Sequence, residues 1–534
     1  MAQITVQDLT FCYEGSYDNI FEKVSFVIDT DWRLGFIGRN GKGKTTFLRL
    51  LQGQLEYQGS IRTLTAFDYF PYPITKEQEK LPAAEFFGEL RPDCELWKVL
   101  RELDQLELDP ECLFRPFSTL SHGERTKAML ALLFSEENFF LLIDEPTNHL
   151  DGEARQVVRE YLRRKKGFIL VSHDRELLDA CIDHVLVLNR CTIRVEKGNF
   201  TSWWENKERQ DHFDRAENEK HLREIRKLSE AAERTARWAD KNERTKIGFD
   251  PIEEHDRFAD TRAYIGAKTK KLQSRVRNTQ RRIADEIEEK EGLLKDLENP
   301  VDLKLMPLTF HKELYVSARD FTLGYGSLSS PVIRNLRFEL HRGDRIWLKG
   351  DNGCGKSSLI QALLQKAGYG GESAVKEKQT EEQAYASKQP EGESTEMLTE
   401  GFLEIPKGLI ISYVNQDTSF LWGSLTEFAE KRGLQESLLM ALLRQLDFER
   451  VQFGKRLEEL SEGQKKKVLL AASLLTPAHL YIWDEPLNYI DIFSRMQLEN
   501  LILQYQPTML LVEHDKVFGE KVATKVVDLG ASYS

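Results

Sequence analysis

Short apolar runs recur along the chain, and most of them end at a polar or glycine-rich motif. The runs "WRLGFIG" at 32–38, "FFLLI" at 139–143 and "FILV" at 168–171 have the length and composition of buried strands. Apolar positions with helical spacing come soon after some of these runs, as in "FLRLLQ" at 47–52. Strands that alternate with helices in this way predict an α/β fold.

A long central segment has a different pattern, with sparse apolar positions among charged ones. The spacing of these positions predicts two long helices that pair along a narrow seam. The positions are Leu222, Ile225 and Leu228, and then Leu272, Val276, Ile283, Ile287 and Leu294. Gly248, Pro251 and Gly266 lie between the two sets and should interrupt the helix. We therefore predict a long α-helical hairpin linker over 205–305, with its tip near 240–264.

The sequence on either side of this linker is repeated. "GRNGKGKTT" at 38–46 recurs as "GDNGCGKSS" at 350–358, and "LLIDEPTNHLD" at 141–151 recurs as "YIWDEPLNYID" at 481–491. The repetition predicts two domains of one fold, the first over 1–204 and the second over 306–534. The second copy also contains an acidic insert at 370–396 without Ile, Leu, Phe or Trp, which predicts a surface loop.

Charge and composition limit where the protein acts. The chain carries a formal charge of −12, whereas residues 205–299 are neutral, with 23 basic and 23 acidic side chains. The apolar runs are too short to cross a membrane, and the first residues do not have the pattern of a signal peptide. Six scattered cysteines without a C-x-x-C pair argue against a zinc module and suit a reducing compartment. These features predict a cytoplasmic protein that does not contact a membrane.

Positive charge is concentrated just beyond the predicted tip. The segment "TRAYIGAKTKKLQSRVRNTQRRIA" at 261–284 has eight basic side chains and no acidic one. One interpretation is an ordinary solvated helix face; the other is contact with RNA phosphates, with nearby aromatic rings that stack on bases. The residues that the second interpretation selects are Phe249, Phe258, Arg262, Tyr264, Lys268, Lys270, Lys271 and Arg275.

Both copies contain the spacing G-x-x-x-x-G-K-[ST], each between an apolar strand and an apolar helix. In this context the loop amides surround phosphates, the lysine neutralises their charge, and the hydroxyl binds Mg²⁺. The predicted ATP-binding residues are Gly38, Arg39, Asn40, Gly41, Lys42, Gly43, Lys44, Thr45 and Thr46, and Gly350, Asp351, Asn352, Gly353, Cys354, Gly355, Lys356, Ser357 and Ser358. Tyr13 and Tyr325, each at a predicted strand end, are candidates for stacking on adenine.

Acidic residues end a second apolar run in each copy. Asp144 and Asp484 are predicted to hold Mg²⁺ together with Thr45 and Ser357. Glu145 and Glu485 follow them and are candidates for the general base that activates water. His173 and His514, after a further apolar run, are expected to position that water and the γ-phosphate.

These residues together resemble the ATP-binding-cassette (ABC) superfamily, over roughly 430 residues in the two copies. The motifs "LSHGE" at 120–124 and "LSEGQ" at 460–464 match the family's signature. The resemblance implies two cassettes that close head to tail within one monomer, so that each signature meets ATP bound by the other copy. The signature residues are Ser121, Gly123 and Glu124, and Ser461, Gly463 and Gln464; Gln416 in "ISYVNQ" corresponds to the family's Q-loop ligand of Mg²⁺.

Within the superfamily the chain is similar to the ABC-F class, which acts on ribosomes, and most similar to its Lsa-type antibiotic-resistance branch. This resemblance implies an ATP hydrolase that binds at the ribosomal exit site, near 23S rRNA and tRNA. Its linker would extend toward the peptidyl-transferase centre and promote release of lincosamides, streptogramin A or pleuromutilins. Two alternatives stay open: a housekeeping ABC-F translation factor without a drug role, and the ATPase subunit of a transporter.

The sequence also departs from the family pattern. The first signature glycine is replaced by His122 in one copy and by Glu462 in the other. Tyr72 stands where the Q-loop glutamine of the first copy is expected. We therefore expect the two ATP sites to differ.

Overall fold

The computed structural model describes residues 2–244, 281–283 and 304–530, apart from gaps at 14–18, 40, 93, 137, 149, 190, 327–330, 352, 369–396, 447, 449 and 489. The chain divides into two compact units. The first unit contains Met1–Thr201 and Val301–Ser534 and so includes both sequence repeats, here called the first and second cassettes. The other unit is Ser202–Pro300.

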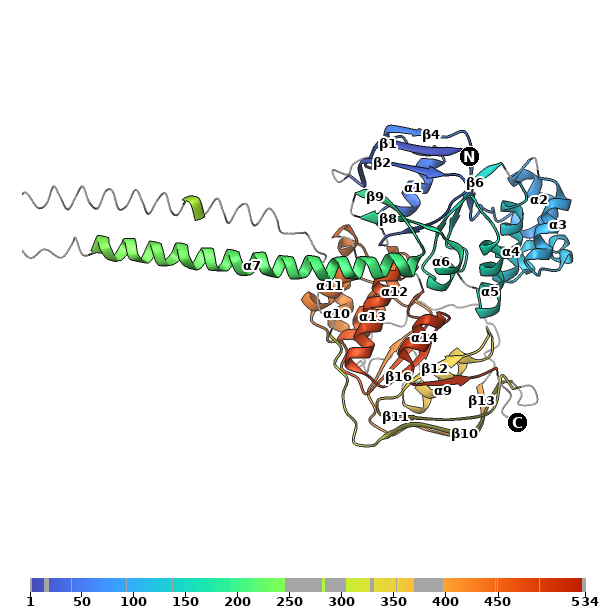
Figure 1. Cartoon of the computed structure of the whole chain (residues 1–534). Helices are drawn as coiled ribbons and strands as arrows, with labels where there is room; N and C mark the ends of the chain where they lie inside the picture. Colours follow the sequence, from blue (N-terminus) through green and yellow to red (C-terminus); the bar gives the residue numbers. More distant parts are fainter. Residues whose placement is uncertain are drawn as a thin grey trace, which may run out of the picture. The chain divides into compact units, whose positions relative to one another are not determined.

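A six-stranded sheet in the order β5-β6-β7-β3-β8-β9 forms the centre of the first cassette (Figure 1). All neighbours in it are parallel except β8 and β9. Its central strands are buried almost throughout because helices cover parallel sheets on both faces, which explains their continuous apolar runs. The strands are β3 Arg33–Ile37, β5 Ala66–Phe70, β6 Phe139–Asp144, β7 Phe168–Val171, β8 His184–Asn189 and β9 Thr192–Lys197.

A second, antiparallel sheet in the order β2-β1-β4 belongs to the same cassette. Its strands are β1 Gln3–Phe11, β2 Phe21–Asp29 and β4 Gln58–Arg62. Buried side chains of this sheet, such as Ile4 and Phe21, share one core cluster with Phe36 of β3 and Phe47 of α1. The cassette's helices are α1 Lys44–Leu51, α2 Ala83–Leu90, α3 Leu96–Gln105, α4 His122–Leu133, α5 Gly152–Arg163 and α6 Arg175–Cys181.

The second cassette repeats this architecture. A five-stranded parallel sheet has the order β14-β15-β16-β12-β17, and an antiparallel sheet has the order β11-β10-β13. The strands are β10 Leu314–Tyr325, β11 Ile333–His341, β12 Arg345–Lys349, β13 Met397–Glu404, β14 Ile411–Val414, β15 Leu480–Asp484, β16 Met509–Val512 and β17 Lys525–Asp528. The helices are α9 Lys356–Lys366, α10 Leu425–Lys431, α11 Glu436–Gln445, α12 Glu462–Leu475, α13 Ile492–Tyr505 and α14 Lys516–Val522. Two tandem α/β cassettes of this kind confirm the predicted fold class.

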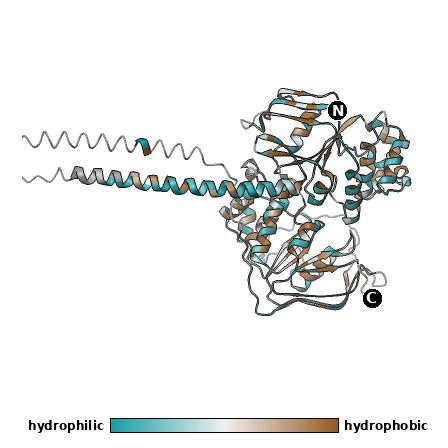
Figure 2. Cartoon of the chain, in the orientation of Figure 1, coloured by the Kyte–Doolittle hydropathy of each residue, from teal (hydrophilic) through white to brown (hydrophobic). Residues whose placement is uncertain are grey.

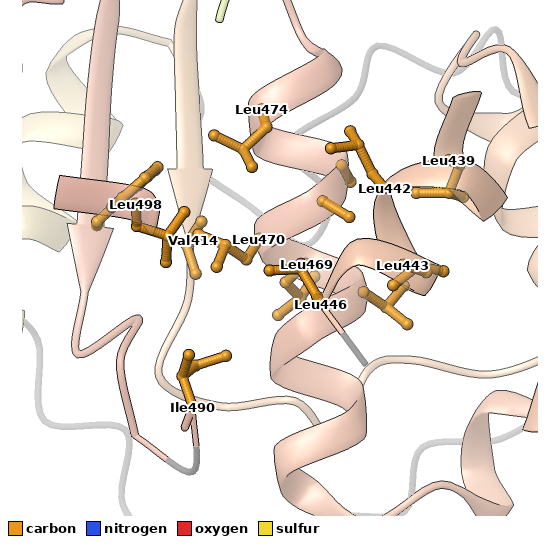
Figure 3. Close-up of a cluster of buried hydrophobic side chains, with 14 of the residues drawn as sticks. Val414, Leu439, Leu442, Leu443, Leu446, Leu469, Leu470, Leu474, Ile490 and Leu498 are labelled. Atoms are coloured by element: carbon orange, nitrogen blue, oxygen red, sulfur yellow. The ribbon is translucent and has the colours of Figure 1, made fainter. Parts of the chain in front are cut away.

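Helix α12 is central to the packing of the second cassette. Leu469 and Leu470 of α12 lie in one buried cluster with Leu443 of α11, Val414 of β14 and Leu498 of α13 (Figure 3). This cluster fixes the helix that follows the second signature motif against the strands that carry the second acidic motif. Leu305, which the sequence placed at the end of the linker, is buried in the same cluster.

The unit between the cassettes contains one long helix, α7 Phe200–Arg244, which is hydrophilic over most of its length (Figure 2). Ion pairs at i,i+4 spacing, such as Arg209 with Glu205 and Arg223 with Glu219, support its exposed surface. The first of the two predicted linker helices is thus present, and Leu222 on it is exposed. Residues 281–283 are also helical. The predicted tip, the basic segment before residue 281 and the acidic insert lie outside the described residues.

No helix in the described part of the chain has the length and apolar character needed to span a membrane.

Candidate ATP sites

A glycine-rich loop joins a buried strand to a helix in each cassette, β3 to α1 and β12 to α9. The last glycine before each helix has a left-handed backbone, with φ 107° at Gly43 and 97° at Gly355. A Cβ at Gly43 would lie 2.5 Å from Ile20 Cγ2, and one at Gly355 would lie 2.8 Å from Val332 Cγ1. Glycine is therefore required at both positions. Each loop leads the backbone amides of a helix N-terminus toward the place where phosphates would bind.

The two loop lysines occupy equivalent positions. Lys44 Nζ donates hydrogen bonds to the main-chain oxygens of Gly38 at 2.6 Å and Arg39 at 3.1 Å. Lys356 Nζ does the same to Gly350 at 2.7 Å and Asp351 at 2.9 Å. Each ammonium group is thus held by its own loop. All the predicted loop residues are described except Asn40 and Asn352.

The two candidate adenine-stacking tyrosines lie beside these loops. Tyr13 Oη is 2.9 Å from Thr46 Oγ1, and Tyr325 Oη donates to Ser358 Oγ at 2.9 Å. Both rings remain accessible, with 42% and 39% of the residue surface exposed. The structure therefore brings each tyrosine to the first turn of the phosphate-loop helix and leaves ring surface available for a base.

The predicted Mg²⁺ ligands also lie together in each cassette. Thr45 Oγ1 donates to Asp144 Oδ2 at 3.0 Å, and Ser357 hydrogen-bonds to Asp484. Asp484 Oδ1 is buried without a hydrogen-bond partner among the described residues. Burial raises the pKa of Asp144, and burial together with Glu485 raises that of Asp484 to about 6. A buried carboxylate oxygen beside a hydroxyl group is a donor set that fits a hard cation.

The Q-loop position differs between the cassettes, as the sequence predicts. Tyr69 pairs with Leu142 in the first sheet, and Tyr413 pairs with Ile482 in the second. This register makes Tyr72 the counterpart of Gln416, because each lies three residues further on.

The side chains at these positions differ in direction as well as chemistry. Gln416 Nε2 donates to Glu485 Oε2 at 2.8 Å, so it lies at the candidate base. Tyr72 Oη instead donates to Asp68 Oδ2 at 2.6 Å, and Tyr69 Oη donates to Asp144 Oδ2 at 3.2 Å. The Q-loop side chain of the first cassette therefore bonds to Asp68 of β5, whereas that of the second cassette bonds to the candidate base.

Glu145 and Glu485 share an unusual backbone. Their φ angles are 50° and 48°, a left-handed conformation that is costly for a residue with a side chain and is typical of functional sites. His173 Nε2 lies 3.3 Å from Glu145 Oε1, and His514 Nε2 lies 3.3 Å from Glu485 Oε1. Each predicted base is therefore next to its predicted histidine. Burial, with the positive charge of Lys44 and Arg495, lowers the pKa of His173 well below its ordinary value.

The surroundings of the two glutamates are not equal. Glu485 Oε2 accepts a second amide bond, from Asn488 Nδ2 at 2.8 Å. Glu145 Oε2 accepts a longer bond from the His173 amide at 3.4 Å, and Glu145 Oε1 is buried with His173 Nε2 at 3.3 Å. Burial and the adjacent Asp144 raise the pKa of Glu145 to about 8, against the opposing charges of Lys44 and Arg495. Burial would also raise the pKa of Glu485, but His514, Lys466 and Asn488 outweigh it and hold the pKa at about 2.

Each signature serine caps a helix. The Ser121 side chain accepts from the Glu124 amide and the Ser461 side chain accepts from the Gln464 amide, while Glu124 and Gln464 bond back to the serine amides. This capping box fixes the helix N-terminus that follows the motif. The predicted contact between each signature and the nucleotide of the other cassette stays a prediction.

The first and second cassettes meet through buried charged groups. Arg175, which begins α6, donates two hydrogen bonds to Glu499 of α13, one of them at 3.2 Å. Arg495 Nη1 donates to the main-chain oxygen of His173 at 3.1 Å and to Asp515 Oδ2 at 3.1 Å. The loop that carries the first predicted histidine is thus attached to the second cassette.

The pseudo-symmetric positions cannot form the same pair. By motif alignment Lys516 corresponds to Arg175, and Arg159 corresponds to Glu499. Arg159 instead pairs with Glu176 inside its own cassette. Two cations cannot form an ion pair, so the Arg175–Glu499 pair has no equivalent at these positions.

Sequence reasoning missed Tyr69, Asn488, Lys466 and the Arg175–Glu499 pair. Counting back three residues from the Q-loop position could have found Tyr69, and the repeated Asn after "DEPT" and "DEPL" could have indicated Asn488. Nothing in the sequence indicates that residues 175 and 499 meet.

Comparison with known proteins agrees with this geometry. The family model described as "ABC transporter" matches residues 21–148 and 333–488, together more than half of the chain. The chain belongs to the ABC family. Both matched segments include a phosphate loop, a signature and an acidic motif, so this ABC protein is an ATP hydrolase with two nucleotide-binding cassettes.

Relatives of this ABC protein match it over nearly its full length. It is 28% identical to "Ribosome protection protein VmlR" of Bacillus subtilis (strain 168), over 95% of this chain and 84% of that protein. It is 25% identical to "Energy-dependent translational throttle protein EttA" of Haemophilus influenzae, over 96% of this chain and 89% of that protein. These similarities place it in the ABC-F class.

A solved structure has the same fold. It is the complex of archaeal ribosomal stalk protein aP1 and archaeal ribosome recycling factor aABCE1, with a TM-score of 0.57 and 19% identity. The match covers 98% of this chain and 88% of that chain.

Proposed function

We propose that this ABC-F protein binds the ribosome in an ATP-dependent manner and protects it from antibiotics. The observation that carries the proposal is the similarity to a ribosome protection protein over 95% of the chain. The long charged helix α7, which follows the first cassette in the sequence, also supports it, because the alternative of a transporter ATPase subunit leaves this element unexplained. The proposed drugs are lincosamides, streptogramin A and pleuromutilins.

The residues of each cassette suggest how ATP is bound and hydrolysed. The loop amides with Lys44 or Lys356 would bind the phosphates, and Tyr13 or Tyr325 would stack on the adenine. Thr45 with Asp144, and Ser357 with Asp484 and Gln416, would hold Mg²⁺, which neutralises phosphate charge when it is bound.

The candidate base in each cassette is the glutamate that follows this aspartate. Glu145 or Glu485 would accept the proton of the attacking water, and His173 or His514 would keep that carboxylate and the water in place. The signature serines 121 and 461 would contact the nucleotide of the opposite cassette, so that bound ATP favours the closed pair. Both sites would therefore form within one monomer.

The linker is the proposed contact with the ribosome. α7 is 45 residues long, which at 1.5 Å per residue corresponds to about 68 Å. An arm of this length could carry the basic segment and the aromatic residues Phe249, Phe258 and Tyr264 toward 23S rRNA and tRNA near the peptidyl-transferase centre. Phosphate contacts would supply affinity, and the tip would displace the drug or the RNA around it.

A translation assay in the presence of each drug tests the proposal. The purified protein should restore synthesis that a pleuromutilin or lincosamide inhibits, and alanine at Phe249 or Phe258 should reduce this recovery while most ribosome binding is kept. Trp97 on α3 of the first cassette, an exposed tryptophan that is not part of the linker, provides a matched aromatic-to-alanine control. Failure to restore synthesis with any of the drugs would contradict the protective role.

A second candidate is a translation factor without a drug role, which the similarity to the translational throttle protein favours. Such a factor would bind ribosomes with ATP and alter synthesis without drug, yet would leave drug inhibition unchanged. The same assay run with and without drug therefore separates the two functions.

A further inference from the structure

A buried lysine contacts the turn at residues 485–488 of the second cassette, here called the catalytic turn, which begins with the candidate base Glu485. Lys466 is in the second turn of α12 and is only 3% exposed. Its Nζ donates a hydrogen bond to the main-chain oxygen of Glu485 at 3.2 Å. Since a buried ammonium is costly unless it is paired, its position needs an explanation.

A buried glutamate on the neighbouring strand end supplies opposite charge. Glu513 follows β16 and is 7% exposed, and after Glu485 it is among the carboxylates whose negative charge favours the Lys466 ammonium. Its Oε1 accepts a hydrogen bond from the Leu487 amide at 2.8 Å. Lys466 therefore holds the carbonyl of residue 485, and Glu513 holds the amide of residue 487.

These contacts act on a turn that is strained. Glu485 has a φ of 48°, and such a backbone persists only where surrounding contacts fix it. The turn also returns Asn488 Nδ2 to the Glu485 carboxylate at 2.8 Å. Contacts on the turn's backbone thus determine where the carboxylate lies.

The first cassette has the same strained glutamate without these two contacts to its turn. Motif alignment places Thr126 at the position of Lys466 and Ser172 at the position of Glu513. Ser172 Oγ accepts from the Asp174 amide instead of from the catalytic turn. The lysine and the glutamate therefore occur together in one cassette and are both replaced in the other.

We propose that Lys466 and Glu513 are positioning residues for Glu485, which clamp the 485–488 turn of the second cassette so that its carboxylate is fixed for hydrolysis. Neither side chain contacts the nucleotide in this proposal. The clamp gives the second ATP site a rigid base, and the first site hydrolyses ATP with a base that is held less firmly.

The test replaces Lys466 and Glu513 by the residues found at the same positions of the first cassette. The double variant Lys466→Thr/Glu513→Ser copies the first cassette and leaves no buried unpaired charge. Turnover is measured in wild type and in a Glu145→Gln background, in which only the second site has its base. The clamp predicts that kcat falls about tenfold, the order of loss that a displaced catalytic group causes, while the KM for ATP changes less than about twofold. Lys466→Arg, which keeps the charge and the donor, should retain most of the activity.

Two controls make the result specific. Lys407→Thr removes the same charge from an exposed turn and should leave turnover unchanged. In a Glu485→Gln background, where only the first site has its base, the double exchange in the second cassette should also leave the residual rate unchanged.

The reciprocal variant Thr126→Lys/Ser172→Glu, in the Glu485→Gln background, should raise the residual kcat of the first site severalfold. A folded Lys466→Thr/Glu513→Ser protein with unchanged kcat would overturn the proposal. If that protein does not fold, a folded reciprocal variant without any gain in kcat would overturn it equally.

Discussion

Replacement of the two candidate bases by glutamine should affect turnover unequally. Glutamine keeps the size of the side chain and removes its ability to accept a proton. Glu485 has the amide donors of Gln416 and Asn488 at 2.8 Å and His514 at 3.3 Å. Glu145 has His173 at 3.3 Å, and its Q-loop counterpart Tyr72 bonds to Asp68 instead. We therefore expect most steady-state hydrolysis to occur at the site of Glu485.

The expected loss of kcat follows from the contribution that a positioned general base makes to the rate. General bases contribute about 10²- to 10⁴-fold to a rate. If the second site carries most of the turnover, Glu485→Gln should lower kcat at least about 100-fold, which corresponds to about 2.7 kcal/mol of barrier. Glu145→Gln removes only the minor contribution and should lower kcat less than about tenfold.

Phosphate release by the two single variants and the double variant measures this directly. Binding of a fluorescent ATP analogue, run in parallel, shows whether each variant still binds nucleotide. Equal losses in the two single variants, or a larger loss in Glu145→Gln, would refute the reasoning from the Q-loop. Near wild-type turnover in the double variant would refute the assignment of both bases.

Three further perturbations test other parts of the account. Tyr72→Gln should raise the residual turnover of the Glu485→Gln variant, because it returns an amide to the Q-loop position; a fall or no change in phosphate release would contradict this. Arg175→Met leaves Glu499 buried with Lys521 as its remaining cation among the residues that the structure describes. This change should cost about 3 kcal/mol of stability, of which Arg175→Met/Glu499→Leu should recover most; equal melting temperatures of the single and double variants would count against a coupled pair. Burial raises the pKa of Glu513 from 4.5 to about 7, so its contribution to stability is complete below pH 4.5 and is lost as the pH rises to about 7. Glu513→Gln removes this loss. The free energy of unfolding of the variant relative to wild type should therefore rise by up to about 3 kcal/mol between pH 5 and pH 8, which melting temperatures across this range can follow. A constant difference across this range would exclude the titration.

Local sequence patterns predicted much of the fold and of the two sites. The phosphate loops, the acidic strand ends and the histidines follow from motifs whose chemistry requires a strand on one side and a helix on the other. Tyr72 was assigned correctly to the Q-loop position because sheet register follows residue spacing. The first linker helix was also recognised from its apolar spacing.

What the sequence did not predict depends on tertiary packing. Residues 465–467 are three consecutive lysines, and the orientation of α12 determines that Lys466 is the one that reaches the Glu485 carbonyl. The direction of Tyr72 depends on Asp68, which no motif marks. Arg175 and Glu499 are 324 residues apart, so their pairing appears only when both cassettes are folded and in contact.

Binding of the nucleotide-trapped protein to ribosomes tests the central claim most directly. The variant Glu145→Gln/Glu485→Gln should bind ATP without hydrolysing it, and so hold the cassettes closed. Its sedimentation with purified ribosomes is measured with ATP, with ADP and without nucleotide. The account predicts binding that is strong with ATP, weak with ADP and reduced by salt. Ribosome binding that is absent, or equal with ATP and ADP, would contradict it.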